Sequence, residues 1–275
     1  MSTLPRVPVQ YTYVDGAPIY LRHAGPTTLP GVLPPLVRGY PVLCLHGSGG
    51  NSGYHSDLIE ALAANHSPLA FDQPGHGRSG GLDSLGSVER MALLTRALVQ
   101  KLGISRPVLL GHSLGGAVAL RYALDSPDEL RAIVLCGSAA RFGTAPEMVE
   151  GVRRVTQGRE RRAFLRDAFS PKTSDEVVRR GWREDMKTDP RVILGDLLAA
   201  QAWDVTAKLG AVRVPTLVLV GEDEHPRLKA QAELLSREIP GARMRTFPEA
   251  GHALPLEQPH AVAEAVSEFL GGLPE

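Results

Sequence analysis

The stretch PVLLGHSLGG, residues 107–116, decides the fold of this chain. Its first six residues are typical of a buried strand, and residues 114–127, in which apolar side chains recur every three or four positions, are typical of a helix. Ser113 lies at the junction, with Gly111 two positions before it and Gly115 two positions after it. A serine nucleophile must stand clear of a sheet on a tight turn, and small flanking residues relieve the crowding of that turn. The stretch therefore predicts a strand, a sharp turn with an exposed serine, and a helix whose N-terminus faces the site.

Short apolar runs similar to the first part of this stretch recur along the chain and alternate with helix-like segments. The runs are 41–46, 68–72, 131–137 and 215–221, and the helix-like segments include 57–66, 87–103 and 260–272. Runs that are apolar at successive residues suit strands buried on both faces, as in a parallel sheet. Their alternation with helices predicts a doubly wound α/β sheet. Residues 10–25 differ, because two extended segments flank Asp15-Gly16, which predicts an antiparallel ribbon at the edge of the sheet.

The alternation stops between the fourth apolar run and the fifth. Residues 147–169, 174–189 and 191–205 are expected to form helices with no strand between them, which predicts an all-helical insertion. The many arginines of this insertion are interspersed with acids, so we interpret them as a solvated helical face. Six of its larger apolar residues could line a pocket, although packing between the insertion and the sheet is favoured for most of them. They are Phe142, Met148, Phe164, Leu197, Leu198 and Trp203.

The composition excludes several classes of protein. Lys plus Arg and Asp plus Glu are 30 each among 275 residues, so the net charge is zero and the basic surplus typical of a nucleic-acid-binding protein is missing. The sequence has no apolar run long enough to span a membrane and no secretory signal at its start, so no membrane partner is expected. Cys44 and Cys136 lie inside apolar runs and are predicted to be buried thiols. These features favour a cytoplasmic location.

Further segments show a resemblance to a known family. They are HGSGG at 46–50, DQPGHGRS at 72–79, GEDEHP at 221–226 and Gly251-His252, each placed after a predicted strand. With the turn at Ser113, the chain resembles the α/β-hydrolase fold family over about residues 40–270, as a serine carboxylesterase-like member with a helical cap. The resemblance implies a mostly parallel eight-stranded sheet with helices on both faces. It also implies a core domain of residues 1–140 and 209–275, and a cap of residues 141–208.

A serine hydroxyl needs a base to attack an ester, and His252 is the predicted base among nine histidines. It follows the last predicted strand beside a glycine, and the family order of serine, acid and histidine agrees. His112 is too close to the nucleophile in sequence for productive approach, and His46 and His76 are expected to make supporting hydrogen bonds.

A carboxylate must then orient the histidine. The family pattern Gly-x-x-Asp aligns with Glu224, which is the predicted acid, and the adjacent Asp223 is the alternative.

Ester hydrolysis also requires donors for the oxyanion. The resemblance assigns this role to the backbone N–H groups of Ser48 and Leu114. The loop that begins at Asp72 is expected to be structural. No metal-ligand spacing and no phosphate-binding loop occur in the sequence, so neither a metal nor an organic cofactor is expected.

The sequence therefore predicts a hydrolase of carboxylic esters with short to medium acyl chains, acting on a small-molecule ester through an acyl-enzyme intermediate. The alternatives on the same triad are a C–C bond hydrolase of vinylogous diketone acids, a lactonase and a thioesterase. A non-catalytic binding module is the alternative from another class. The sequence predicts no particular oligomeric state.

Overall fold

A computed structural model describes residues 9–26, 32 and 35–274, and within these residues eight strands form one sheet. The strands are β1 Val9–Val14, β2 Ala17–His23, β3 Pro41–Leu45, β4 Ser67–Phe71, β5 Val108–His112, β6 Ala132–Cys136, β7 Thr216–Gly221 and β8 Arg243–Phe247. Their order in the sheet is β1-β2-β4-β3-β5-β6-β7-β8. β2 pairs antiparallel with β1 and β4, and all other pairs are parallel. The mostly parallel sheet and the antiparallel ribbon at its edge are confirmed.

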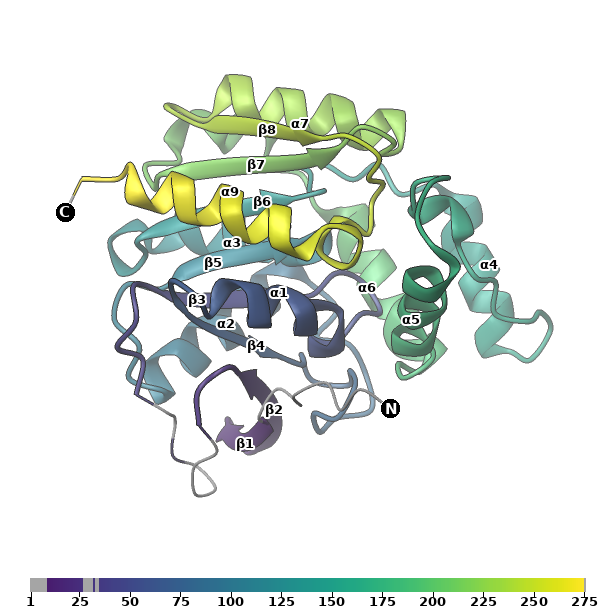
Figure 1. Ribbon diagram of the computed structural model, residues 1–275. Coiled ribbons are helices and arrows are strands. Elements are labelled where there is room, and N and C mark those ends of the chain that lie inside the picture. The colour runs from purple at the N-terminus through teal and green to yellow at the C-terminus, as the bar shows by residue number, and fades with distance from the viewer. Residues whose placement is uncertain (1–8, 27–31, 33–34, 275) are drawn as a thin grey trace.

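Helices cover both faces of the sheet (Figure 1). The helices around the sheet are α1 Ser56–Leu62, α2 Val88–Lys101, α3 Leu114–Asp125, α7 Pro226–Glu238, α8 Leu254–Glu257 and α9 Pro259–Gly271. Three short 3₁₀-helices, η1 Ser52–His55, η2 Pro127–Glu129 and η4 Thr206–Ala211, join these elements. In β5, Leu109 packs with α2, α3 and α7, whereas Val108 and Leu110 pack with α1 and α9 on the other face. Successive side chains of a strand point to opposite faces, so the continuous apolar runs follow from burial on both sides.

The predicted helical insertion lies between β6 and β7. It contains α4 Pro146–Thr156, η3 Arg166–Ala168, α5 Asp175–Asp185 and α6 Pro190–Ala202, and α4 and α5 lie to one side of the sheet (Figure 1). At its base the backbones of Arg141 and Asp204 pair as an isolated antiparallel bridge, and Val205 N–H donates to Ala140 C=O at 3.0 Å. These contacts lie close to residues 141 and 208, which stay the predicted limits of the cap.

The helix expected over residues 147–169 is wrong in length, because α4 ends at Thr156. Gly158 has a φ of +69°. Its N–H donates to Val155 C=O at 3.0 Å, and Arg159 N–H donates to Arg154 C=O at 2.9 Å. This pair of hydrogen bonds is the Schellman motif, in which a glycine in the left-handed region ends a helix. The other two insertion helices lie within the predicted ranges or begin one residue earlier.

The six apolar residues considered for a pocket differ in burial, and Phe164 and Leu197 are half-buried. Phe142 and Trp203 are buried, and the Trp203 indole N–H donates to Ala139 C=O at 3.0 Å, so both residues pack the insertion onto the core. Met148 and Leu198 are largely exposed. Packing therefore explains the buried pair, as expected from the need of a small cap to bury its own apolar face.

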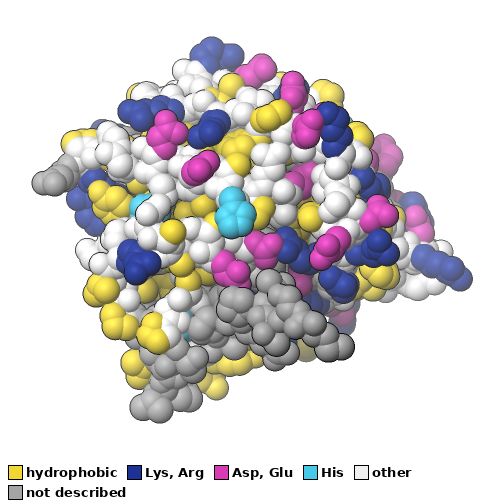
Figure 2. Space-filling model, viewed as in Figure 1, with side chains coloured by type: hydrophobic (Ala, Val, Ile, Leu, Met, Phe, Trp, Pro, Cys, Tyr) yellow, Lys and Arg dark blue, Asp and Glu magenta, His cyan; other side chains and the backbone are white. Residues whose placement is uncertain are grey.

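The charge distribution of the surface and the burial of the two cysteines agree with what the sequence predicts. On the face shown in Figure 2, acidic and basic side chains are interspersed over the described part of the surface, as their equal numbers lead one to expect. Cys44 and Cys136 are free and fully buried, as predicted, and burial raises the pKa of Cys44 to about 12. In the part of the chain that the structure describes, no helix has the length and apolar character needed to cross a membrane.

Candidate active site

Ser113 forms a strained turn between β5 and α3. Its φ of +53° lies in the left-handed region, which residues other than glycine rarely adopt. Three hydrogen bonds hold this backbone: Ser113 N–H donates to Cys136 C=O at 2.9 Å, and Ser113 C=O accepts from Gly116 N–H at 2.9 Å and from the Ser138 hydroxyl at 2.8 Å. The predicted turn therefore exists, and the neighbouring strand β6 supports it.

The glycines on either side of Ser113 are required by the closeness of the backbone. A Cβ atom on Gly111 would lie 2.2 Å from the carbonyl oxygen of Gly115, and one on Gly115 would lie 2.3 Å from the carbonyl oxygen of Leu45. Both atoms belong to the main chain, so they cannot move aside as a flexible side chain would. The steric reason for small residues at these positions is confirmed.

Replacing Gly115 by alanine is expected to destabilise the protein by about 2 kcal/mol or more, because the added methyl group must displace the end of β3. The matched control is Gly271→Ala near the end of α9, where an added Cβ meets nothing within 4 Å. There alanine should be neutral or stabilising by up to about 1 kcal/mol. Urea unfolding of both variants tests this, and equal midpoints for the two would contradict the steric argument.

His252 and Glu224 form a hydrogen-bonded pair. His252 follows β8, and its Nδ1 lies 2.7 Å from Glu224 Oε2, while Glu224 Oε1 accepts the His225 N–H at 2.8 Å. The Glu224 side chain is 1 % exposed and the His252 side chain is 24 % exposed. The alternative acid, Asp223, instead accepts a hydrogen bond from the Ser170 hydroxyl at 2.6 Å. The structure thus brings Glu224, and not Asp223, to the histidine.

The protonation of His252 follows from this pairing. Burial alone would lower the pKa of His252, but the charge of Glu224 and its hydrogen bond outweigh burial and raise the pKa above its usual value. Because a carboxylate can only accept, the hydrogen on the neutral ring lies on Nδ1, which leaves Nε2 as the basic atom.

His112 has a different task. Its Nε2 lies 2.7 Å from the carbonyl oxygen of His252, and burial holds the pKa of His112 well below the usual range. His112 therefore supports the backbone of the histidine loop and does not compete as a base.

Ser113 and His252 both lie near the carboxyl end of β6. Ser113 N–H donates to Cys136 C=O, and a Cβ atom on the next residue, Gly137, would lie 3.2 Å from His252 Nδ1 and 3.1 Å from Glu224 Oε2. Among the described residues, no hydrogen bond joins Ser113 Oγ to His252 Nε2. In free enzymes such contacts are often long and tighten when substrate binds. Gly137 was not among the predicted site residues, although a glycine at the end of the apolar run 131–137 could have indicated it.

The turn after β3 lies against the nucleophile. A Cβ atom on Gly47 would lie 3.0 Å from the Cβ of Ser113. Gly47 C=O accepts from Gly50 N–H at 3.0 Å and faces the Nδ1 of His46 at 2.9 Å. Since a trans peptide places its N–H opposite its C=O, fixing the Gly47 carbonyl also fixes the direction of the Ser48 N–H.

Two backbone donors are left free beside the serine. In the described part of the chain, neither the Ser48 N–H nor the Leu114 N–H has an acceptor, and Leu114 is the first residue of α3. The positive end of a helix dipole adds to the attraction for a negative charge at this place. The arrangement can therefore bind an oxyanion.

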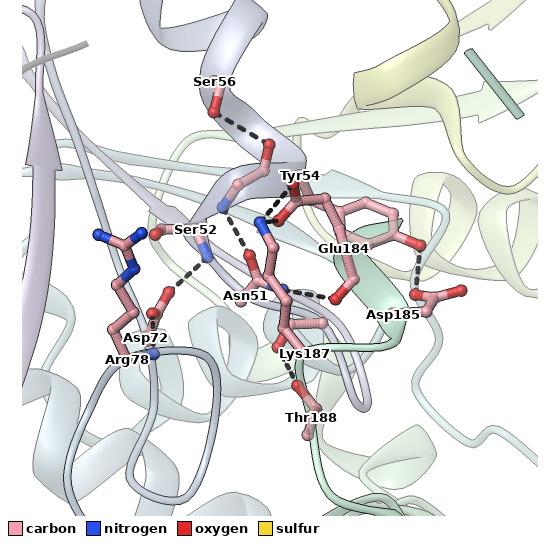
Figure 3. A network of polar contacts seen from close by, with 12 residues as sticks. Asn51, Ser52, Tyr54, Ser56, Asp72, Arg78, Glu184, Asp185, Lys187 and Thr188 are labelled. Carbon is pink, nitrogen blue, oxygen red and sulfur yellow. Dashed lines mark hydrogen bonds and ion pairs between the residues drawn. The ribbon is translucent and has the colours of Figure 1, made fainter. Parts of the chain in front are cut away.

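The segment after this turn is held by buried polar contacts (Figure 3). The Asp72 carboxylate accepts from Ser52 N–H at 2.6 Å and from Arg78 N–H at 2.8 Å, which agrees with the structural role expected for its loop. The Asn51 amide donates to Glu184 C=O at 3.0 Å, at the end of α5. The loop that carries Ser48 is thus fixed from the core and from the insertion.

A cavity of about 610 Å³ adjoins the acid side of this site. It is lined by the insertion residues Asp167 and Phe169 and by the segment after β7, including Glu224. Ser113 and His252 do not line it, so this cavity reaches the site only at Glu224. Among the described residues, no group of three or more His, Cys, Asp or Glu side chains is placed to hold a metal ion.

Comparisons with known proteins agree with this geometry. The sequence model of the alpha/beta hydrolase family matches residues 42–265. The chain is 27% identical to 2-hydroxy-6-oxo-6-phenylhexa-2,4-dienoate hydrolase of Burkholderia cepacia, over 85% of this chain and 88% of that protein. It is 30% identical to a RutD protein assigned as a carbamate hydrolase in Pseudomonas savastanoi pv. phaseolicola, over 84% and 93%. A thermophilic esterase from Thermogutta terrifontis is similar in structure, with a TM-score of 0.80 and 27% identity over 98% of both chains.

The fold, the turn at Ser113 and the paired His252 and Glu224 define an enzyme-like site on an α/β sheet. The chain belongs to the alpha/beta hydrolase family. Its relatives are named for the hydrolysis of different bonds. What these relatives have in common is hydrolysis, so the comparisons support a hydrolase without defining the bond that it cleaves.

Proposed function

We propose that this chain is a serine hydrolase of carboxylic esters with short to medium acyl chains. The observation that carries the proposal is the pairing of His252 Nδ1 with the buried Glu224 at 2.7 Å, on the same end of the sheet as Ser113. A histidine held in this tautomer presents Nε2 as a base to a serine hydroxyl, which is too weakly acidic to react alone. The similarity to the Thermogutta esterase supports the choice of esters.

The reaction would proceed in two halves. Ser113 Oγ attacks the ester carbonyl while His252 Nε2 takes its proton, and the N–H groups of Ser48 and Leu114 stabilise the oxyanion. His252 then returns the proton to the leaving alcohol, which leaves Ser113 acylated. Water activated by His252 hydrolyses the acyl-enzyme, and the Glu224 carboxylate stabilises the imidazolium in both halves.

A C–C bond hydrolase of vinylogous diketone acids is the second candidate. The Burkholderia relative supports it by name, and such an acid requires a cation beside the site. Arg162 in the insertion is partly buried, and burial lowers the pKa of its guanidinium. It donates to Thr188 C=O at 2.9 Å, and the Thr188 hydroxyl donates to Gly50 C=O at 3.4 Å. Arg162 is thus linked through Thr188 to Gly50, the last residue of the turn that carries Ser48, which supports this second candidate.

A substrate panel separates the two candidates. We expect the purified chain to hydrolyse p-nitrophenyl acetate, butyrate and octanoate faster than the dodecanoate, with a burst of p-nitrophenol from acylation. A 2-hydroxy-6-oxo-dienoate acid is tested as the alternative substrate, and its cleavage is measured as a decrease in its absorbance. Rapid cleavage of the dienoate with no turnover of any ester would contradict the esterase proposal and favour the second candidate.

A further inference from the structure

Asp196 is a buried carboxylate of α6 that the triad does not use. It is 1 % exposed, yet its oxygens accept from three groups of the core. Oδ2 accepts from Gly49 N–H at 2.9 Å and lies 2.8 Å from His76 Nε2, and Oδ1 accepts from the Ser84 hydroxyl at 2.6 Å. A buried charge is tolerated only when it is paired and hydrogen-bonded, and here both conditions hold.

The hydrogen bonds of His76 indicate that it is charged. Its Nδ1 lies 3.0 Å from the carbonyl oxygen of Pro74, and its Nε2 faces the Asp196 carboxylate. Both partners can only accept, so both ring nitrogens must carry hydrogen, which makes the ring an imidazolium. Burial alone would lower the pKa of His76, but Asp196 outweighs burial and raises it, and the same pairing holds the pKa of Asp196 below its usual value.

The other ionisable groups around His76 agree with this charge. The charge of Asp72, on the same loop, favours the protonated form of His76. The ring of His46 lies 4.7 Å from the ring of His76, centroid to centroid. Burial first, and then the charge of His76, lower the pKa of His46 to about 4. The neutral His46 ring accepts the Gln73 N–H at Nε2, at 3.0 Å, and so carries its hydrogen on Nδ1.

Asp196 acts directly on the oxyanion turn. Gly49 has a φ of +65° and is the third residue of the turn closed by Gly50 N–H and Gly47 C=O, which fits a type II turn. Asp196 holds the N–H of the central peptide of this turn. A Cβ atom on Gly49 would lie 2.8 Å from Ile193 Cγ1, so α6 rests on the turn without a gap. The insertion is thereby connected to the residue next to the donor Ser48.

We propose that Asp196 is a positioning residue for the oxyanion turn, and that its buried ion pair with a protonated His76 holds the turn in place. The inference rests on the proposed function, because it gives the Ser48 N–H a role in catalysis. While His76 is charged, the carboxylate keeps the Gly49 peptide and α6 together. When the pH rises through the raised pKa of His76, the ion pair is lost, the turn loosens, and kcat falls.

The first experiment titrates His76 in the free, wild-type protein by ¹⁵N NMR of the imidazole nitrogens, with His76→Gln used to assign its signals. We expect both nitrogens to carry hydrogen at neutral pH and to titrate above the usual histidine pKa of about 6.5. Titration at or below that value would overturn the proposal. This readout needs no substrate, so it stands even if the ester panel shows the proposed function to be wrong.

The second experiment compares Asp196→Asn with Ser84→Ala, which removes a donor from the same carboxylate but leaves Gly49 and His76 in contact with it. For Asp196→Asn we expect kcat for p-nitrophenyl butyrate to fall about tenfold to a hundredfold, with KM changed by less than about twofold. In this variant the fall of kcat at alkaline pH (the alkaline limb) should disappear, because no ion pair is left for the deprotonation of His76 to break. Ser84→Ala should keep the wild-type limb.

Three results would overturn the proposal. One is an alkaline limb that Asp196→Asn leaves in place, and another is the loss of that limb in Ser84→Ala. The third applies to His76→Gln, whose amide can still donate to Asp196 but cannot lose a charge. Its kcat should show no fall at alkaline pH, and a fall like that of the wild type would contradict the role of His76 even if Asp196→Asn does not fold.

Discussion

Replacing Ser113 by alanine is expected to lower kcat for p-nitrophenyl butyrate by roughly 10⁴-fold to 10⁶-fold, because no other group can form the acyl-enzyme. The residual rate would come from the oxyanion donors Ser48 and Leu114, whose backbone N–H groups the change leaves in place. The Ser113 hydroxyl has no hydrogen-bond partner among the described residues, so its loss should change the free energy of unfolding by about 0.5 kcal/mol or less. Steady-state kinetics and urea unfolding measure the two quantities.

Ser126→Ala is the matched control for this variant. Ser126 lies at the other end of α3, before η2, and its side chain makes no capping hydrogen bond to η2, so its removal should leave kcat unchanged. A fluorophosphonate should label the wild type and Ser126→Ala but not Ser113→Ala. Undiminished turnover in Ser113→Ala would contradict the serine mechanism, and labelling of Ser113→Ala would place the reactive hydroxyl elsewhere.

The parts of the fold that could be predicted are those that depend on neighbours in sequence. The strand β5 is apolar at successive positions because both of its faces are buried, and the same holds for β3 and β4, whose five residues each are almost entirely buried. The turn at Ser113 could be predicted because Gly111 and Gly115 are required by backbone atoms, and a glycine requirement is visible in the sequence.

The parts that could not be predicted depend on contacts between distant segments. The family pattern favoured Glu224 but left the adjacent Asp223 open, because which of the two acids faces the histidine is set by the path of the loop. That path depends on Asp223 N–H donating to Ala250 C=O at 2.9 Å, a contact made across the sheet end. The role of Asp196 is likewise not visible in the sequence, where it is only a single acid among the apolar residues of α6. Only the packing of α6 on Gly49 gives this acid its partners.

Replacing Glu224 by glutamine is expected to lower kcat by about 10⁴-fold near neutral pH, although the side chain keeps its size. Glu224 Oε1 accepts the His225 N–H, so the glutamine oxygen should take that place and its amide NH₂ should face His252 Nδ1. An NH₂ group can only donate, which forces the hydrogen of the ring onto Nε2. In that tautomer His252 has no lone pair for the proton of Ser113.

Asp223→Asn is the matched control and should retain kcat within about twofold, because Asp223 contacts Ser170 and not the histidine. The pH profile adds an independent readout. In the wild type kcat/KM should fall as the pH drops through the raised pKa of His252, since the base must be neutral. Without the charge of Glu224, burial lowers that pKa, so the acid limb of Glu224→Gln should move to lower pH. If Asp223→Asn lost activity and moved the limb while Glu224→Gln did neither, the assignment of the acid would have to be reversed, because the carboxylate that faces His252 holds its proton and is the main cause of its raised pKa.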